Sequence, residues 1–208
     1  MQSKFITFEG GEGTGKSTQS HLLADYLRDQ GITVTITREP GGTEGAELIR
    51  ALLVSGTTGR WSPLSEVLLL NAARLDHWQK VILPALNAGK WVICDRFTDS
   101  TIAYQGYGHG VDLTFIKTLN QQLFSSHIPD LTFVFDLDPV IGIKRSLQRH
   151  TSENRFENMQ LEFHNRMRQG YLEIARENPD RCRIIDAAGT VSEIQKLTIK
   201  EVAKFIIS

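Results

Sequence analysis

The sequence predicts an α/β fold built around a parallel sheet. Short apolar runs rich in β-branched and aromatic residues alternate with helical patterns from one end of the chain to the other. These runs occupy residues 5–9, 33–37, 91–95, 131–136 and 183–186. Near-continuous apolar strands are typical of parallel sheets that are buried on both faces. A chain of 208 residues is long enough for one compact domain without disulfides, and we expect residues 1–208 to form a single domain.

The helical patterns between these strands carry start and stop signals. Helical spacing of apolar residues in the segment 19–30 ends at Gly31, a residue suited to the left-handed conformation that follows a helix. Later helices are predicted to begin after Ser62, Asp138 and Thr190, each a capping residue followed by a proline or by a capping-box glutamate.

Composition excludes several classes of function. The net charge is −1, whereas proteins that bind nucleic acid along its backbone usually carry a basic excess, so we expect no nucleic-acid partner. Cys94 and Cys182 are too few and too far apart for a disulfide framework, which favours buried free thiols and a reducing compartment. No leader pattern precedes the first strand, and no apolar run approaches the ~18 residues of a membrane span. We therefore expect a cytoplasmic protein without membrane contact.

A phosphate-binding loop directly follows the first predicted strand. The segment matches the pattern G-x-x-x-x-G-K-[ST], in which glycines let backbone N–H groups turn around a phosphate and the lysine reaches the β and γ oxygens. The hydroxyl after the lysine is suited to Mg²⁺. We therefore predict an ATP site, with Lys16 also catalytic. Its residues are Gly10, Gly11, Glu12, Gly13, Thr14, Gly15, Lys16, Ser17 and Thr18.

A second Mg²⁺ ligand is expected beside Ser17, at the end of another apolar strand. Asp95 ends the run 91–95 and suits a carboxylate that holds the Mg²⁺ shell, while Asp136 ends a similar run and is the alternative. The guanine-reading pattern N-K-x-D does not occur in the sequence, so transfer of a phosphoryl group to an acceptor is favoured over a GTPase switch.

Three arginines are candidates for binding an anionic acceptor. Arg38, Arg74 and Arg96 lie near predicted strand ends or on a helix, and ligands of open α/β sheets bind at the carboxyl ends of the strands. Alternatively, each arginine is a surface charge in a weak solvated pair.

Several ordered motifs occur together in segments 8–18, 37–43, 72–74, 95–106 and 129–132. With them the chain resembles the bacterial thymidylate kinases along essentially its whole length. The resemblance implies a three-layer phosphate-loop NTPase fold, in which helices flank a five-stranded parallel sheet and a small lid is present. It implies direct in-line transfer from ATP, with Mg²⁺, to thymidine 5′-monophosphate (dTMP), giving dTDP for dTTP synthesis. It also implies a homodimer.

The resemblance assigns roles to individual residues. Glu12 matches the loop acid that meets the acceptor's sugar hydroxyl and takes part in catalysis, and Arg96 matches the catalytic arginine that grips the acceptor phosphate. Tyr104 matches a ring that lies near the deoxyribose and excludes a 2′-hydroxyl. The implied acceptor site comprises Glu12, Arg38, Pro40, Leu70, Arg74, Arg96, Thr101, Tyr104 and Gln105.

The polar segment 146–158 resembles the lid of this family. One subgroup of the family carries a catalytic arginine inside the phosphate loop, whereas the other has glycine there and supplies the arginine from the lid. Gly13 occupies that loop position here, so a lid arginine is expected, with Arg155 favoured over Arg149.

One position departs from the family pattern. Relatives commonly have a phenylalanine that stacks on thymine where this chain has Leu70, so weaker dTMP affinity or altered base tolerance is a hypothesis. Three other functions stay open: a kinase for another base, a deoxynucleoside kinase and a non-catalytic nucleotide-binding protein. The cluster of arginines favours a phosphorylated acceptor over a neutral nucleoside.

Overall fold

The computed structural model describes residues 2–124, 128–148 and 155–206. Five strands form one sheet in the order β2-β3-β1-β4-β5, and every pairing is parallel. The strands are β1 (Phe5–Gly10), β2 (Val34–Arg38), β3 (Trp91–Asp95), β4 (Leu131–Asp136) and β5 (Cys182–Asp186). The five predicted runs are thus confirmed with ends that shift by no more than about one residue.

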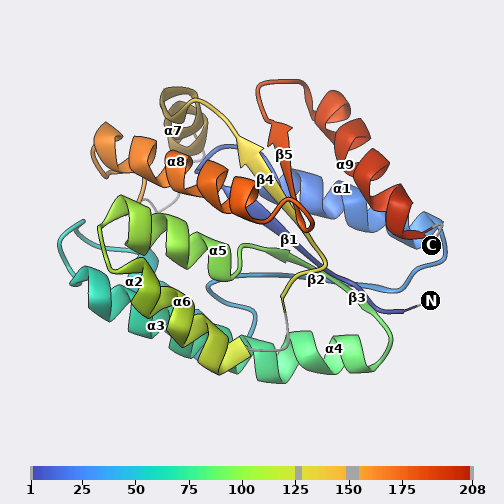
Figure 1. Cartoon of the computed structure of the whole chain (residues 1–208), viewed down its shortest axis with the longest axis horizontal. Helices are drawn as coiled ribbons and strands as arrows, with labels where there is room; N and C mark the ends of the chain where they lie inside the picture. The colour runs from blue at the N-terminus through green and yellow to red at the C-terminus, as the bar shows by residue number, and fades with distance from the viewer. Residues whose placement is uncertain (1, 125–127, 149–154, 207–208) are drawn as a thin grey trace.

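Helices cover both faces of the sheet and complete three layers (Figure 1). One face carries α1 (Lys16–Asp29) and α9 (Val191–Ile206), which share an apolar core with the sheet. The other face carries α3 (Pro63–His77), α4 (Leu83–Asn87), α6 (Leu113–Phe124) and α8 (Leu161–Glu177). The remaining helical elements are α2 (Glu44–Val54), η1 (Trp78–Ile82), α5 (Thr98–Thr101), η2 (Ile102–Gly108) and α7 (Pro139–Leu147), of which η1 and η2 are π-helical.

The predicted capping signals are present at the helix ends. The Ser62 side chain accepts a hydrogen bond from the backbone N–H of Ser65, and Asp138 accepts one from Val140. Gly31 follows α1 with φ 78°, as a helix-terminating glycine does. Helix α1 begins at Lys16, earlier than its apolar spacing indicates, because the phosphate loop leads directly into its first turn.

The sheet brings the predicted site together at one edge. Asp95 of β3 lies opposite Phe8 of β1 and Arg38 of β2, so the phosphate loop and both downstream loops start from neighbouring strand ends. Cys94 and Cys182 are free and buried, as predicted. Within the described residues, no helix combines the length and apolar character needed to cross a membrane.

Candidate active site

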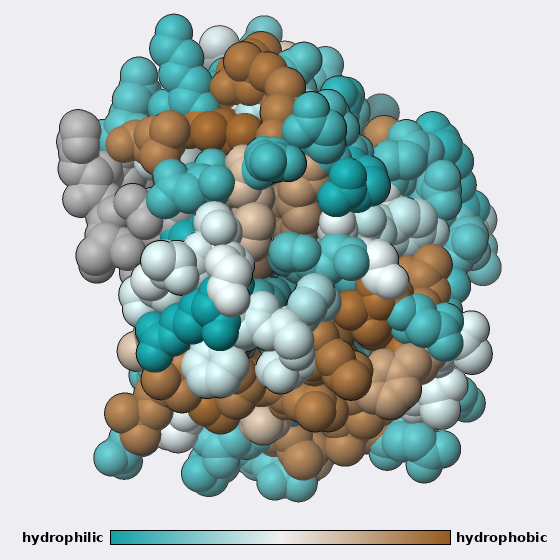
Figure 2. Space-filling view, turned by 90° about the vertical axis from the view of Figure 1, so that its left-hand side faces the viewer, coloured by the Kyte–Doolittle hydropathy of each residue, from teal (hydrophilic) through white to brown (hydrophobic). Residues whose placement is uncertain are grey.

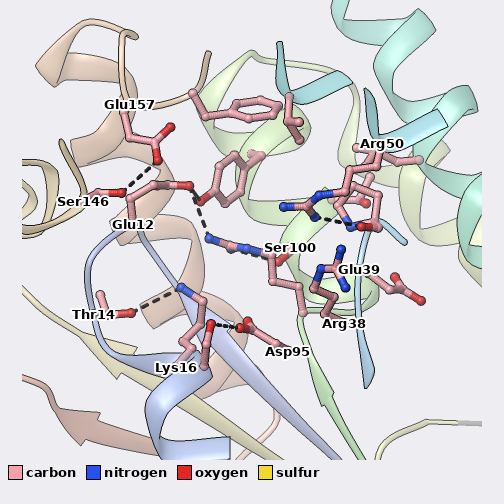
Figure 3. Close-up of a pocket in the computed structure, with 18 of the residues that line it drawn as sticks. Glu12, Thr14, Lys16, Arg38, Glu39, Arg50, Asp95, Ser100, Ser146 and Glu157 are labelled. Atoms are coloured by element: carbon pink, nitrogen blue, oxygen red, sulfur yellow. Dashed lines mark hydrogen bonds and ion pairs between the residues drawn. The ribbon is translucent and has the colours of Figure 1, made fainter. Parts of the chain in front are cut away.

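A cavity of about 270 Å³ opens at this edge of the sheet. It extends from the phosphate loop to side chains of α2, α3 and η2 (Figure 3). Of the predicted site residues, those that line it are Glu12, Gly13, Thr14, Gly15, Lys16, Ser17, Arg38, Pro40, Leu70, Arg74, Asp95, Arg96, Thr101, Tyr104 and Gln105. Gly10, Gly11 and Thr18 belong to the same loop but do not line the cavity.

The phosphate loop depends on glycines for its shape. Gly10, Gly13 and Gly15 have φ values of 131°, 66° and 89°, which other residues rarely adopt. A Cβ atom at Gly13 would lie 2.0 Å from the carbonyl oxygen of Gly142, so no side chain fits there without movement of α7. This loop therefore has no room for an arginine at position 13.

The side chain of Lys16 folds back onto the phosphate loop. Its Nζ donates hydrogen bonds to the carbonyl oxygen of Gly11 at 2.6 Å and to Thr14 Oγ1 at 3.3 Å. Burial and the positive charge of Arg96 lower the pKa of Lys16 to about 8. A phosphate ligand would replace these neutral partners with charged oxygens and hold the lysine protonated.

The two predicted Mg²⁺ ligands meet at the loop. Ser17 Oγ donates to Asp95 Oδ2 at 2.5 Å, and Asp95 Oδ1 is a buried oxygen to which no described residue donates a hydrogen bond. The alternative ligand Asp136 instead accepts two hydrogen bonds from Arg168, at 2.6 and 3.0 Å. A hydroxyl beside a free carboxylate oxygen suits Mg²⁺, so the residues present fit that ion at Ser17 and Asp95.

Arg96 lies in a turn with φ 73°, and it is the only non-glycine residue with a positive φ among the described residues. Buried Glu9 fixes this turn by accepting hydrogen bonds from the backbone N–H of Phe97 at 2.7 Å and from Ser100 Oγ at 2.6 Å. Burial and nearby Asp99 raise the pKa of Glu9 to about 7. The turn aims the guanidinium at the loop, where it donates to the carbonyl oxygen of Gly10 at 2.9 Å.

Glu12, Tyr104 and Arg96 form one polar cluster. Glu12 Oε1 accepts hydrogen bonds from Tyr104 Oη and, at 3.2 Å, from Arg96 Nη2. Burial alone would raise the pKa of Glu12, but Arg96, Lys16 and the Tyr104 hydrogen bond outweigh it and leave this pKa below its ordinary value. The ionised carboxylate keeps its buried Oε2 without a donor among the described residues.

Arg74 is the best-buried arginine that lines the cavity, with 2% of its surface exposed. It donates to Glu39 at 2.6 Å and to the Thr101 hydroxyl at 3.0 Å, and His77 holds the other oxygen of Glu39 at 3.1 Å. These contacts leave Arg74 Nη1 buried without an acceptor among the described residues. Arg38, in contrast, is half exposed and pairs with Glu47 at 3.1 Å.

Of the two predicted lid arginines, only Arg155 is described, and it does not line the cavity. Arg155 is fully buried and donates to the carbonyl oxygens of Leu53, Thr57 and Thr58 and to Glu66. Arg149 lies outside the described residues, as do all the residues between the two arginines. The predicted lid segment 146–158 is therefore described only at its ends, where Ser146, Phe156 and Glu157 line the cavity.

Sequence reasoning missed several residues of this site. Arg50 of α2 lines the cavity on the side opposite Glu12 and donates to the carbonyl oxygen of Pro40 at 2.8 Å (Figure 3). Glu39 and Ser100 line the cavity as well. They belong to the motif segments 37–43 and 95–106, where their polar side chains could have indicated a role in the site. Arg50 and Glu66 belong to ordinary amphipathic helices, and no local pattern distinguishes them.

A glycine loop at the end of a central parallel strand, facing an arginine-lined cavity, defines a phosphate-loop nucleotide-binding protein. The family model "Thymidylate kinase" matches residues 8–198. The chain belongs to the thymidylate kinase family.

Relatives of known name support this assignment over the whole chain. The chain is 52% identical over 186 residues to a thymidylate kinase of Caulobacter vibrioides, with 89% of each chain covered. It is 46% identical over 209 residues to a thymidylate kinase of Magnetococcus marinus, with 100% of each covered. A crystal structure of thymidylate kinase from Ehrlichia chaffeensis matches with a TM-score of 0.80 and 41% identity, covering 98% of this chain and 99% of that one. The predicted family and fold are confirmed.

Proposed function

We propose that the protein transfers the γ-phosphoryl group of ATP to dTMP in the cytoplasm, giving ADP and dTDP for dTTP synthesis. The observation that carries this proposal is a cavity with a phosphate loop at one end, whose lining residues hold four buried polar atoms without a hydrogen-bond partner among the described residues. These atoms are Glu12 Oε2, Arg74 Nη1, Asp95 Oδ1 and Gln105 Oε1. Buried polar groups are normally paired, so a cavity lined by four unpaired ones is suited to a polar ligand.

The donor phosphates would lie on the loop 10–18, with Lys16 at the β and γ oxygens. Ser17 and Asp95 would hold Mg²⁺, which when bound supplies positive charge to the phosphates. Because the donor loop and Arg96 line the same cavity, transfer can run directly in line between two bound nucleotides. The enzyme's contribution is then positioning and charge stabilisation.

The acceptor would lie across the cavity from the loop. Arg96, with Arg38, would bind its phosphate, since a planar guanidinium matches phosphate geometry. The free Oε2 of Glu12 would accept a hydrogen bond from the 3′-hydroxyl, and Tyr104, fixed by Glu12, would exclude a 2′-hydroxyl. Arg74, Thr101 and Gln105 would bind the base, with Pro40 and Leu70 as its apolar contacts.

The lid arginines remain part of the proposal. In this structure Arg155 is bound to three carbonyl oxygens and to Glu66, so a catalytic role requires its guanidinium to leave those partners. We retain 146–158 as the lid within one domain spanning 1–208.

A homodimer is the expected assembly. Exposed leucines Leu64 and Leu68 of α3 and exposed Phe115 of α6 lie on neighbouring helices. In Figure 2, apolar residues gather on the lower part of the face, the level at which α2, α3 and α6 lie in Figure 1. Replacing Leu68 by Asp should shift the mass measured by light scattering from dimer to monomer; an unchanged mass would place any interface elsewhere.

The proposed reaction is tested by one coupled assay of ADP formation. Purified protein with ATP and Mg²⁺ is offered each nucleoside monophosphate and, separately, thymidine. We expect dTMP to give the highest kcat/KM. A different preferred monophosphate would overturn the base assignment, and activity with thymidine alone would overturn the acceptor-phosphate site while leaving the ATP site intact.

A further inference from the structure

A buried carboxylate lies directly behind the base end of the cavity. Glu66 of α3 is 1% exposed and does not line the cavity. Its Oε2 accepts a hydrogen bond from Gln105 Nε2 at 2.9 Å, and its Oε1 accepts one from Arg155 Nη2. His109 is the third group at this carboxylate, with Nε2 3.9 Å from Oε2.

The contact with Glu66 fixes the orientation of the Gln105 side-chain amide. An ionised carboxylate only accepts hydrogen bonds, so the NH₂ group of Gln105 must point toward Glu66. The other branch of the amide, Oε1, is then left as a buried acceptor without a donor among the described residues. Gln105 itself lines the cavity, so we infer that the free branch offers an acceptor to the base end.

Another residue that lines the same cavity supplies a donor. Arg74 is hydrogen-bonded to Thr101, which precedes Gln105 by one helical turn, and its Nη1 is also buried without an acceptor among the described residues. The base end thus presents one donor and one acceptor, and the ligand that complements this pair has a ring N–H next to a carbonyl oxygen. Thymine and uracil carry that pattern at N3 and O4, whereas cytosine has an acceptor at N3 and an amino group at C4.

We propose that Glu66 is a positioning residue for base selection: by holding the Gln105 amide with its oxygen toward the cavity, it makes the site select pyrimidines that carry an N3–H. This inference rests on the proposed function, because it concerns the same acceptor. Arg155 holds Glu66 in place through the carboxylate oxygen that Gln105 does not contact. Its three bonds to backbone carbonyls fix the guanidinium, and the guanidinium in turn fixes Glu66.

The test is Glu66→Gln, which changes one oxygen to an NH₂ group of nearly the same size. The amide oxygen at position 66 will accept from Arg155, since a charged donor makes the stronger hydrogen bond. Its NH₂ group then faces Gln105 and requires that amide to turn over, which places a donor toward the cavity. We expect kcat/KM for dTMP and for dUMP to fall together by about 10- to 100-fold relative to dCMP, because a buried N3–H then meets a donor.

Two further variants separate positioning from general damage. Adding Gln105→Glu to Glu66→Gln restores an accepting oxygen toward the cavity, and we expect it to recover most of the dTMP-to-dCMP ratio. Glu173→Gln is the control. Glu173 of α8 accepts a hydrogen bond from Tyr107 of η2 and does not line the cavity, so this variant should leave the dTMP-to-dCMP ratio unchanged.

The outcomes are distinct. If wild-type enzyme prefers dTMP but Glu66→Gln keeps its dTMP-to-dCMP ratio, the role of Glu66 is overturned and the proposed function stands. A fall in the dTMP-to-dUMP ratio with no recovery in the double variant would equally overturn it, because that result indicates disturbed packing around the base. If wild-type enzyme prefers another acceptor, the proposed function itself fails before the variants are compared.

Discussion

The two ends of the cavity are built in different ways. The donor end is one contiguous loop whose backbone shape depends on glycines, and among the described residues the hydrogen bonds of the Lys16 ammonium group stay within that loop. The acceptor end is a set of buried side chains from separate elements, in which Arg74 depends on Glu39 and Gln105 depends on Glu66. The donor end therefore forms from local sequence, whereas the acceptor end forms only when the whole fold is assembled.

This difference predicts that substitutions at the acceptor end affect stability and that substitutions at the donor end affect catalysis. Buried ion pairs couple the acceptor residues to the core, since removing one partner leaves the other charge uncompensated. Four substitutions or conditions would sharpen or break the comparison.

The largest effect on stability is expected from Arg155→Ala. It leaves Glu66 buried without the guanidinium that compensates its charge, so the free energy of unfolding in urea should fall by about 3–5 kcal/mol. Arg168→Ala is the matched control, because its pair with Asp136 is substantially exposed and should contribute no more than about 1 kcal/mol. Equal losses in the two variants would contradict the view that the acceptor network is part of the core.

The same variant tests the catalytic role that the sequence predicts for Arg155. Measured where the variant is folded, kcat should fall far more than the KM for dTMP rises, if the guanidinium serves the transition state. A change in KM alone would remove Arg155 from the catalytic residues and leave it as a structural partner of Glu66.

At the donor end, Lys16→Met should lower kcat by about 10²- to 10³-fold, since one charged donor to the phosphates is lost. The melting temperature should not fall, because the loop keeps its glycines and a buried ammonium group is removed. Steady-state kinetics and a thermal melt check both parts. A large loss of stability would show that the donor end is as tightly coupled to the core as the acceptor end.

Affinity for ATP should depend on pH through Lys16 itself. Burial and Arg96 lower the pKa of Lys16 to about 8, so the ammonium group is present below that pH and is lost above it. The contribution of Lys16 to ATP affinity should therefore be fully present well below pH 8 and should fall by up to about tenfold per pH unit above it. Calorimetric titration at several pH values measures this. In Lys16→Met this decline in ATP affinity should be absent. If the decline persists in the variant, another titrating group causes it.

The donor end of the site could be predicted from the sequence to a greater extent than the acceptor end. The strands, the capping signals and the phosphate loop were predicted because each depends on residues that are close in the sequence. Glu66 and Arg155 are 89 residues apart, and no local pattern indicates that they pair. Arg155 is predicted as a lid residue, yet its partners lie in the last turn of α2, just after α2 and on α3, and only tertiary packing brings them to it.

The smallest expected effect belongs to Leu70→Phe, at the position where the family resemblance leads us to expect an aromatic residue. Leu70 lines the cavity and, in the proposed function, would offer aliphatic contact to the base. A phenyl ring adds stacking of about 0.5–1.5 kcal/mol, so the dissociation constant of dTMP should fall by about 2- to 12-fold, measured by calorimetry. Thymidine should gain in the same proportion, because the added contact is to the base and not to the phosphate. An unchanged constant would mean that the base does not lie against position 70, and that its placement depends on the polar pair of Arg74 and Gln105 alone.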